Sequence, residues 1–235
     1  MEGNENTAAL SHVVKEAYPV LYLLHGMGNN HAQWRGYTNI ELFAGEHNIA
    51  VVMISGENKY YRDMDGEDRF FEFLSKEVPE FVTNYFPISA APEHSYIAGL
   101  SMGGYGALLH GLTHPERFAA IGSFSGVMLP ADTVNDSERE DKYANGLFDM
   151  IWLAKTVLKE GKKVPPLYIA CGEDDSLYKA NVEFVTVLRE QHADVTWVSV
   201  PGFAHVWRFW NRQVEEFLKW IPRTDGYAEK GLRQI

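Results

Sequence analysis

Short apolar runs recur along the whole chain, and their pattern limits the folds that the chain can adopt. Each run is continuous rather than alternating, and several end in glycine or serine. Continuous apolar runs of this length are typical of strands that are buried on both faces, which occur in parallel sheets. The six runs are VLYLLHG (20–26), IAVVMIS (49–55), SYIAGLS (95–101), FAAIGSFSG (118–126), PLYIACG (166–172) and VTWVSVPG (195–202).

Amphipathic segments with helical spacing separate these runs. Apolar side chains recur every three or four residues in 69–86, 181–190 and 207–220. Alternation of strands and helices predicts an α/β fold, with a mostly parallel central sheet and helices on both of its faces. A chain of 235 residues is long enough for one sizeable core, so we expect a single domain over residues 1–235.

The longest gap between apolar runs spans residues 129–164. It opens with the polar ADTVNDSEREDKYANG and continues as the helical LFDMIWLAKTVLKEG. Long insertions above strand ends are often lids or pocket walls, so one interpretation is a lid or cap insertion. A plain crossover helix that follows a long surface loop explains the pattern equally well.

Charge and cysteine content narrow the choice of partners. The formal net charge of −11 argues against nucleic acid or an anionic membrane as the partner. The single cysteine, Cys171, excludes an intrachain disulfide framework. The chain contains no apolar window of about 18 residues, and its N-terminus lacks the pattern of a signal peptide. We therefore expect a cytoplasmic protein; a secreted form whose leader has been removed and a homo-oligomer both stay open.

The stretch IAGLSMGGYGALL places Ser101 in a G-x-S-x-G motif between a predicted strand and a predicted helix. A serine on so tight a strand-to-helix turn has a strained backbone, and side chains at Gly99 and Gly103 would collide. The helix that begins at Met102 points its free N–H groups at the serine. This context is the nucleophile elbow of serine hydrolases, so Ser101 is the predicted nucleophile.

A serine hydroxyl needs a base, and in this topology the partners follow in the order acid, then histidine. The stretch CGEDDSLY (171–178) follows a predicted strand and offers Asp174 and Asp175. The stretch PGFAHVWRFW (201–210) follows the last strand and offers His205 on a loop. His205 is the predicted base, and either aspartate could orient it while the other caps the next helix.

The loop after the first strand, in LLHGMGNNHAQW, predicts half of an oxyanion hole. In this class that loop supplies one backbone N–H, and the residue after the nucleophile supplies the other. We assign these donors to the amides of Met27 and Met102. We expect His25 to hydrogen-bond the backbone beneath the site rather than to take part in catalysis.

Some remaining residues lie near predicted strand ends. The serines of SFSGV (123–127) lack the elbow motif and are interpreted as sheet-end structure.

No metal-binding spacing is present, so we expect no metal and no cofactor. The aromatic residues predicted to line an acyl or sugar pocket are Trp34, Tyr60, Tyr61, Tyr178 and Trp207.

Several stretches together resemble the esterase D-like putative esterases, over roughly residues 19–220. Within this group the chain looks most like tributyrin esterases and like the carbohydrate esterases that remove acetyl or feruloyl groups. The stretches are YLLHGMGNNHAQW, NKYYRDM, FPISAAPEHSYIAGLSMGGYGAL, HPERFAAIGSFSG, LYIACGEDDSLY and GFAHVWRFW. The resemblance implies an α/β-hydrolase fold. The family opens with an antiparallel strand pair, whereas here fewer than 20 residues precede the first clear strand and AALSHVV offers one short strand at most, so we expect the N-terminal strands to be shortened or missing.

The family motif G-x-x-D falls on Gly172 to Asp175, so the resemblance implies Asp175 as the catalytic acid. The implied function is a serine carboxylesterase that hydrolyses short-chain acyl or aryl esters through an acyl-enzyme on Ser101. Its substrate is a small-molecule ester, with acetylated or feruloylated carbohydrates as candidates. The alternatives are an acyltransferase with a sugar acceptor, a thioesterase like S-formylglutathione hydrolase, and a hydrolase-fold binding module without activity.

Overall fold

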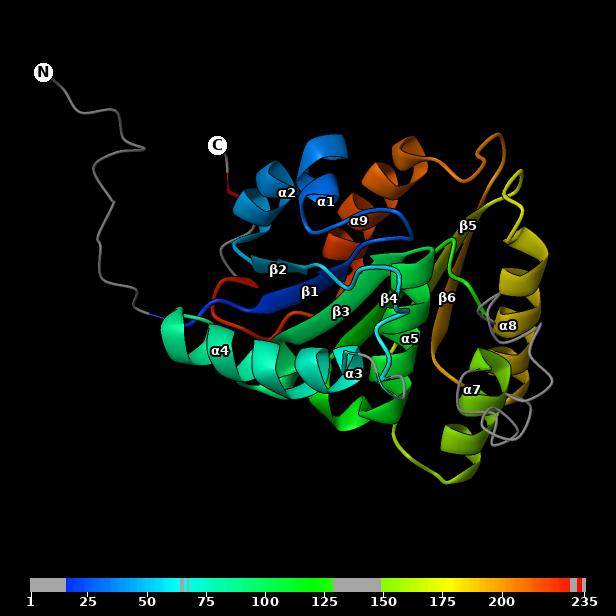
Figure 1. Cartoon of the computed structure of the whole chain (residues 1–235), viewed down its shortest axis with the longest axis horizontal. Coiled ribbons are helices and arrows are strands. Elements are labelled where there is room, and N and C mark those ends of the chain that lie inside the picture. The colour runs from blue at the N-terminus through cyan, green and yellow to red at the C-terminus, as the bar shows by residue number, and fades with distance from the viewer. Residues whose placement is uncertain (1–15, 64–65, 67, 129–148, 229–231, 234–235) are drawn as a thin grey trace, which may run out of the picture.

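The computed structural model describes residues 16–63, 66, 68–128, 149–228 and 232–233 of the chain. Six strands form one sheet in the order β2-β1-β3-β4-β5-β6, and every neighbouring pair is parallel (Figure 1). Each of the six predicted apolar runs contains one of these strands. The strands are β1 (Val20–Leu24), β2 (Ala50–Ile54), β3 (Ser95–Leu100), β4 (Ala120–Phe124), β5 (Leu167–Gly172) and β6 (Val195–Val200).

Helices follow most strands and lie on both faces of the sheet, as the sequence predicts. The α-helices are α1 (Ala32–Tyr37), α2 (Ile40–His47), α3 (Phe70–Glu72), α4 (Val78–Tyr85), α5 (Met102–Thr113), α7 (Met150–Lys159), α8 (Tyr178–Glu190) and α9 (Trp207–Trp220). Two short 3₁₀ turns, Pro92–His94 and Pro115–Arg117, precede β3 and β4.

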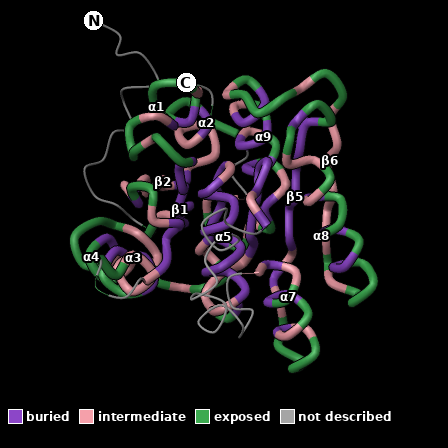
Figure 2. Tube along the Cα trace, turned by 45° about the vertical axis from the view of Figure 1, so that its right-hand side comes forward, coloured by how far each residue is buried: buried purple, intermediate pink, exposed green. Residues whose placement is uncertain are grey.

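Two hydrophobic cores lie on opposite faces of the sheet (Figure 2). Helices α4, α5, α7 and α8 contribute to one core, and α1, α2 and α9 contribute to the other. Side chains alternate between the faces along a strand, so Tyr22 and Leu24 of β1 belong to the first core while Leu21 and Leu23 belong to the second. Burial on both faces explains why the strands read as continuous apolar runs.

The segment predicted as one amphipathic helix over 69–86 is helical but not uniform. A π-helical turn, Phe73–Glu77, separates α3 from α4. Pro79 follows at the second position of α4 and has no N–H to donate to the carbonyl of Ser75. That carbonyl instead accepts a hydrogen bond from the guanidinium of Arg117. The apolar spacing predicts the helix, whereas the local geometry depends on this proline and on a distant arginine.

The region predicted as a lid or a crossover is only partly covered. Residues 129–148 lie outside the described residues, as does AALSHVV near the N-terminus. The helical part forms α7, whose first turn is capped by Asp149 through hydrogen bonds from the N–H groups of Ile151 and Trp152. Helix α7 packs between α5 and α8, so this part of the region belongs to the domain core.

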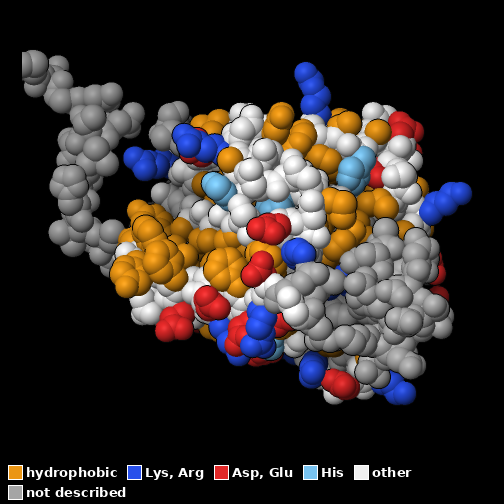
Figure 3. All heavy atoms as spheres, viewed as in Figure 1, with side chains coloured by type: hydrophobic (Ala, Val, Ile, Leu, Met, Phe, Trp, Pro, Cys, Tyr) orange, Lys and Arg blue, Asp and Glu red, His pale blue; other side chains and the backbone are white. Residues whose placement is uncertain are grey.

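An exposed aromatic patch marks one end of the molecule (Figure 3, orange at left). Phe81, Tyr85 and Phe86 are each more than half exposed, and the rings of Phe81 and Tyr85 lie 4.9 Å apart. The chain after this patch runs beside Tyr18, at the amino end of β1. The patch therefore lies away from the carboxyl ends of the strands, where ligands bind in open α/β sheets.

Candidate active site

The residues predicted to act in catalysis all follow the carboxyl ends of parallel strands. Met27 follows β1, Ser101 follows β3, Asp175 follows β5 and His205 follows β6. Because parallel strands end at a common edge of the sheet, these residues share that edge.

The backbone at Ser101 is strained. Its φ is 53° and its ψ is −117°, a conformation that side-chain-bearing residues rarely adopt. The strain is held from both sides, since the Ser101 N–H donates to Phe124 O at 2.9 Å and its carbonyl accepts from Val127 at 3.2 Å. The same carbonyl accepts from Tyr105 at 3.1 Å and so begins α5. Ser101 is therefore fixed on the sharp turn that the sequence predicts.

Two glycines make this turn sterically feasible. A Cβ atom on Gly99 would lie 2.4 Å from the carbonyl group of Gly103. A Cβ atom on Gly103 would lie 2.3 Å from the carbonyl oxygen of Leu24. The start of α5 thus packs directly on the ends of β3 and β1, which explains both glycines of the motif.

Asp175 and His205 form a direct pair, in which Nδ1 of His205 lies 2.8 Å from Oδ2 of Asp175. The Asp175 side chain is fully buried, whereas the His205 side chain is 34% exposed. Burial alone raises the pKa of the Asp175 carboxyl, but the hydrogen bonds from His205 and from the Leu177 N–H, together with the other favourable interactions of the carboxylate, outweigh burial. The pKa of Asp175 therefore lies below its ordinary value, and the carboxylate is ionised at neutral pH.

The neighbouring Asp174 has a different environment. Asp174 is exposed, and its N–H donates to Phe203 O at 3.1 Å. Its carboxylate makes no hydrogen bond within the described residues. The structure brings Asp175, and not Asp174, to the histidine, and the described side chains include no hydrogen-bonded cap at the N-terminus of α8. Asp175 itself accepts the Leu177 N–H at 2.9 Å beside the start of α8.

Two backbone amides lie beside Ser101 without an internal partner. Neither Met27 N–H nor Met102 N–H donates a hydrogen bond within the part of the chain that the structure describes. The loop of Met27 is close to the serine, since a Cβ atom on Gly26 would lie 3.3 Å from Cβ of Ser101. Met102 is the first residue of α5, where a free N–H group is expected.

His25 has the structural role that the sequence analysis expects. Its Nδ1 lies 2.7 Å from Gly26 O, and its Nε2 accepts the Gly56 N–H at 2.9 Å. Burial is the main cause that lowers the pKa of His25, so the ring is neutral at pH 7. Tyr61 donates to the carbonyl of His25 at 3.0 Å. These bonds tie the loop after β2 to the loop after β1.

The loop after β4 contributes a polar residue to which the sequence analysis gives no function. Ser125 is fully buried and has a φ of 49°. Its Oγ accepts the indole N–H of Trp210 at 3.2 Å, and Cys171 Sγ lies 3.9 Å away. The ring of Trp210 also packs edge-on against His205, with 4.8 Å between the ring centroids. The Ser-Gly turn at 125–126 is the only sequence signal that points to this position.

Three of the aromatic residues predicted to line a pocket belong to the hydrophobic cores, and this prediction is corrected. Trp34 and Tyr61 have no exposed surface, and Tyr60 is 5% exposed and packs against Tyr105. A side chain without accessible surface cannot contact a substrate. The Trp34 indole instead donates to Leu24 O at 3.0 Å and so supports the end of β1.

The other two predicted pocket residues, Tyr178 and Trp207, are partly exposed. The hydroxyl of Tyr178 lies 2.9 Å from the hydroxyl of Ser199, and Trp207 stacks on the exposed ring of Tyr37 at 5.0 Å. Their role in substrate binding stays a prediction.

An open groove lies after the carboxyl end of β2, near the loop that follows β1. It has a volume of about 370 Å³ and is lined by Ser55, Glu57, Asp68, Arg69, Phe70 and Phe73. Its wall is tied to the loop after β1, because the His31 N–H donates to Ser55 at 3.2 Å and the Gly28 N–H donates to Asn58 at 2.7 Å. The groove therefore offers charged and hydroxyl side chains near the loop that follows β1.

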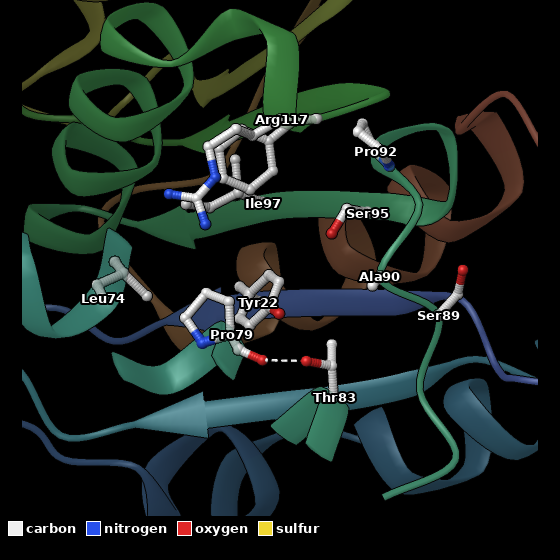
Figure 4. A pocket seen from close by; sticks show the side chains of 11 residues that line it. Tyr22, Leu74, Pro79, Thr83, Ser89, Ala90, Pro92, Ser95, Ile97 and Arg117 are labelled. Carbon is white, nitrogen blue, oxygen red and sulfur yellow. Dashed lines mark hydrogen bonds between the residues drawn. The ribbon is translucent and has the colours of Figure 1, made fainter. Parts of the chain in front are cut away.

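A more enclosed cavity of about 150 Å³ lies elsewhere, between α4 and the sheet (Figure 4). Tyr22 and Ile97 form its floor, Pro79 and Thr83 come from α4, and the Arg117 side chain reaches over Ile97. The loop that enters the amino end of β3 closes it. The cavity is thus remote from Ser101 and is not part of the candidate active site.

The described residues contain no group of three or more His, Cys, Asp or Glu side chains that could hold a metal ion. Among the same residues, no helix has both the length and the apolar character that crossing a membrane requires.

A strained serine between a central parallel strand and a helix, followed along the chain by an Asp–His pair, defines the α/β-hydrolase class. A model of the putative esterase family matches residues 7–221, and the chain belongs to this family. Family membership confirms the prediction of an esterase with the α/β-hydrolase fold.

Individual relatives agree with this placement. The chain is 33% identical to an acetyl esterase of Caldicellulosiruptor saccharolyticus over 90% of this chain and 86% of the relative. It resembles the solved structure of FphF, a fluorophosphonate-binding serine hydrolase of Staphylococcus aureus, with a TM-score of 0.81 and 28% identity over 92% and 88% of the two chains. It also resembles the S-formylglutathione hydrolase FrmB of Staphylococcus aureus, with a TM-score of 0.77 and 29% identity over 89% and 86%.

Proposed function

We propose that the chain is a serine carboxylesterase that removes acetyl and other short acyl groups from small-molecule esters, with acetylated sugars as the leading candidates. The observation that carries the proposal is the Asp175–His205 pair at the sheet edge that also bears the strained Ser101. The relation to an acetyl esterase supports the acyl group, and the charged and hydroxyl side chains in the groove after β2 suit a hydroxylated alcohol.

In the proposed mechanism the Ser101 hydroxyl attacks the ester carbonyl carbon. Asp175 holds the proton on Nδ1 of His205, which leaves Nε2 free to accept the serine proton. His205 then returns this proton to the departing alcohol, and an acyl-enzyme remains on Ser101. The Ser101 hydroxyl makes no hydrogen bond within the described residues, and in free hydrolases this contact often tightens only with substrate.

Charge develops on the carbonyl oxygen as the new bond forms. The amides of Met27 and Met102 are the proposed donors to this oxygen, and the positive end of the α5 dipole adds to their effect. Water attacks the acyl-enzyme in the second half of the reaction, with His205 as base again, and releases the acid.

The test combines covalent labelling with turnover. A fluorophosphonate probe forms a phosphonate ester with the nucleophile and releases fluoride, so mass spectrometry of the labelled protein identifies the serine. We expect the adduct on Ser101, no labelling of Ser101→Ala, and a loss of turnover of 4-nitrophenyl acetate by about 10⁴-fold or more. An adduct on another serine would overturn the assignment.

Rates on a panel of four substrates test which class of ester the enzyme prefers. Acetylated xylose, 4-nitrophenyl butyrate, methyl ferulate and S-formylglutathione present different acyl and leaving groups to the same site. We expect the highest kcat/KM on the acetyl ester. Preference for the thioester would favour the function of the S-formylglutathione hydrolase relative, and transfer of acetyl to added sugar instead of water would favour an acyltransferase.

A further inference from the structure

The cavity between α4 and the sheet is a feature of the fold that the proposed function does not use (Figure 4). Its floor is a pair of side chains from neighbouring strands, since Tyr22 of β1 and Ile97 of β3 are register partners. The loop that closes it is tied to the start of β1, because the Tyr18 N–H donates to Pro87 O and the Ser89 N–H donates to Tyr18 O, both at 2.8 Å. The volume of about 150 Å³ matches that of an engineered protein cavity that holds benzene. The cavity therefore has room for a small organic molecule.

The Arg117 guanidinium brings an unpaired positive charge to this cavity. Its Nη1 donates to the carbonyl oxygen of Ser75, and its other N–H groups have no acceptor within the described residues. No carboxylate of these residues forms an ion pair with Arg117, and none of the residues that line the cavity is acidic. Because Arg117 is partly buried, solvent and salt screen its charge less than they screen an exposed arginine. The cavity thus favours an anion.

Two hydroxyl groups in the cavity are unused. Those of Tyr22 and Ser95 make no hydrogen bond within the described residues, whereas those of Thr83 and Ser89 are bound to neighbouring protein atoms. Tyr22 is only 4% exposed. Burial, opposed in part by the charge of Arg117, raises the pKa of Tyr22 to about 12, so its hydroxyl keeps its proton and can donate. A hydroxyl so deeply buried is costly without a partner, so Tyr22 favours an occupant that accepts a hydrogen bond.

The rest of the lining is apolar and narrows the class of anion. It consists of Leu74, Pro79, Ala90, Pro92, Ile97 and Phe118. Inorganic phosphate would turn several oxygens toward these side chains without donors for them, which is unfavourable. A water molecule would satisfy the Tyr22 hydroxyl but would leave the charge of Arg117 unpaired. A carboxylate on a short alkyl chain carries one negative charge, two acceptor oxygens and an apolar tail, so it fits all three parts of the lining.

We propose that this cavity binds the anion of a short-chain fatty acid, whose carboxylate accepts hydrogen bonds from Arg117 and Tyr22 and whose alkyl chain lies against the apolar wall. The site is separate from the candidate active site, and binding is measured without turnover, so the inference does not depend on the proposed function. The acids that the proposed esterase releases belong to the same chemical class.

The test uses butyrate as the probe. Its binding to the wild-type protein is followed by saturation-transfer NMR and by the rise in melting temperature relative to an equal concentration of sodium chloride. We expect butyrate to bind and to stabilise the protein. Butan-1-ol and butylammonium keep the alkyl chain but change the charge, so we expect them to bind at least about tenfold more weakly.

Two variants change the donors of the cavity. Tyr22→Phe removes the hydroxyl and keeps the ring, and Arg117→Gln removes the charge but keeps an N–H donor for Ser75. We expect each to weaken butyrate binding by about tenfold or more, the effect of one lost hydrogen bond to a charged group. The matched controls, Tyr85→Phe and Arg189→Gln, lie at exposed positions outside the cavity and should bind butyrate as the wild type does. Circular dichroism checks the fold, and Tyr22→Phe decides alone if Arg117→Gln does not fold.

Each other result overturns the proposal in its own way. Unchanged binding in both cavity variants would place butyrate at another site. No binding to the wild-type protein would leave the cavity to water. Equal binding of butan-1-ol would show an apolar cavity without preference for an anion, and tighter binding of inorganic phosphate that the same variants weaken would show a different class of ligand. Turnover of 4-nitrophenyl acetate by the cavity variants, expected within twofold of wild type, keeps the fate of this proposal separate from that of the esterase.

Discussion

The Asp175 side chain is completely shielded from solvent and bonds His205 at 2.8 Å, although the preceding residue, Asp174, is exposed. Two adjacent aspartates on one loop therefore differ in burial, in hydrogen bonding and in their relation to the histidine. The loop backbone causes the difference, because the Asp174 N–H is bound to Phe203 O and the Asp175 N–H to Gly172 O. These bonds turn the second side chain inward.

This difference leads to opposite expectations for the two asparagine variants. Asp175→Asn keeps the shape of the side chain but favours the wrong tautomer of His205, so we expect kcat to fall by roughly 10⁴-fold. Asp174→Asn, the matched control, should change kcat less than twofold and stability by less than about 0.5 kcal/mol. Turnover of one acetyl ester by both variants decides the matter. A greater loss of kcat in the Asp174 variant would show that Asp174, and not Asp175, is the catalytic acid.

The close packing of α5 on the sheet predicts a steric effect at Gly103. A Cβ atom on Gly103 would lie 2.3 Å from Leu24 O, so the backbone at Gly103 or at Leu24 would have to move. We expect Gly103→Ala to lower the free energy of unfolding by about 1–3 kcal/mol or more and to abolish activity. Gly36→Ala is the control in another helix, because its Cβ would meet no atom within 4 Å and alanine favours helix by up to about 1 kcal/mol. Thermal unfolding, followed by circular dichroism, should give a lower melting temperature for Gly103→Ala and a higher one for Gly36→Ala than for the wild type.

A buried ion pair near the C-terminus predicts a pH-dependent part of stability. Arg223 Nη2 lies 2.7 Å and Nε lies 2.5 Å from the two carboxylate oxygens of Asp225, whose side chain is 1% exposed. Burial raises the pKa of Asp225, but the hydrogen bonds and charge of Arg223 outweigh burial and lower it. A lowered pKa in the folded state means that Asp225 stabilises the protein above its unfolded pKa of about 3.9, and that this stabilisation is lost as pH falls through the folded pKa.

We therefore expect Asp225→Asn to lower the free energy of unfolding by about 1.5–3 kcal/mol at pH 7. The gap between this variant and wild type should narrow as pH falls below about 4. Melting temperatures measured from pH 7 to pH 3 report this gap, with Asp174→Asn as a variant of equal charge change. A gap that is constant over this range would contradict the assigned role of the ionised carboxylate.

The only cysteine of the chain should be chemically inert. Burial, followed by the nearby charge of Asp175, raises the pKa of the Cys171 thiol to about 12, and the residue has no exposed surface. Since thiolates and not thiols are nucleophilic, we expect no reaction of the native protein with iodoacetamide and no loss of esterase activity. Labelling should become complete in guanidinium chloride. Inactivation by iodoacetamide under native conditions would show that the thiol is exposed in solution.

Sequence pattern predicts the sheet better than it predicts side-chain direction. Runs that are buried on both faces stand out along the chain, so all six strands lie within their predicted ranges. Proximity to a strand end does not reveal which side chain turns inward. The burial of Trp34 and Tyr61 is therefore not predicted from the sequence. The π-helical turn Phe73–Glu77 is invisible to apolar spacing, because it depends on Pro79 and on a contact with Arg117.

The candidate site shows the same division. The elbow motif and the chain order point to Ser101, to His205 and to either Asp174 or Asp175, and only the family resemblance selects Asp175. Ser125 and Trp210 meet only in the folded molecule, 85 positions apart, and no local motif marks their hydrogen bond. The sequence therefore predicts the residues that are proposed to react, whereas contacts between distant parts of the chain, such as that of Ser125 with Trp210, require the structure.

The order of the strands has a consequence for protein synthesis. The elbow forms on β3, near the middle of the chain, whereas the proposed acid and base follow β5 and β6, and Trp210 lies on the last helix. A ribosome releases these parts in that order. A nascent chain that ends before residue 205 carries the nucleophile without its base. Given the roles proposed for Ser101, Asp175 and His205, ester cleavage requires α9 to have been synthesised and packed. Unfinished chains therefore do not hydrolyse esters.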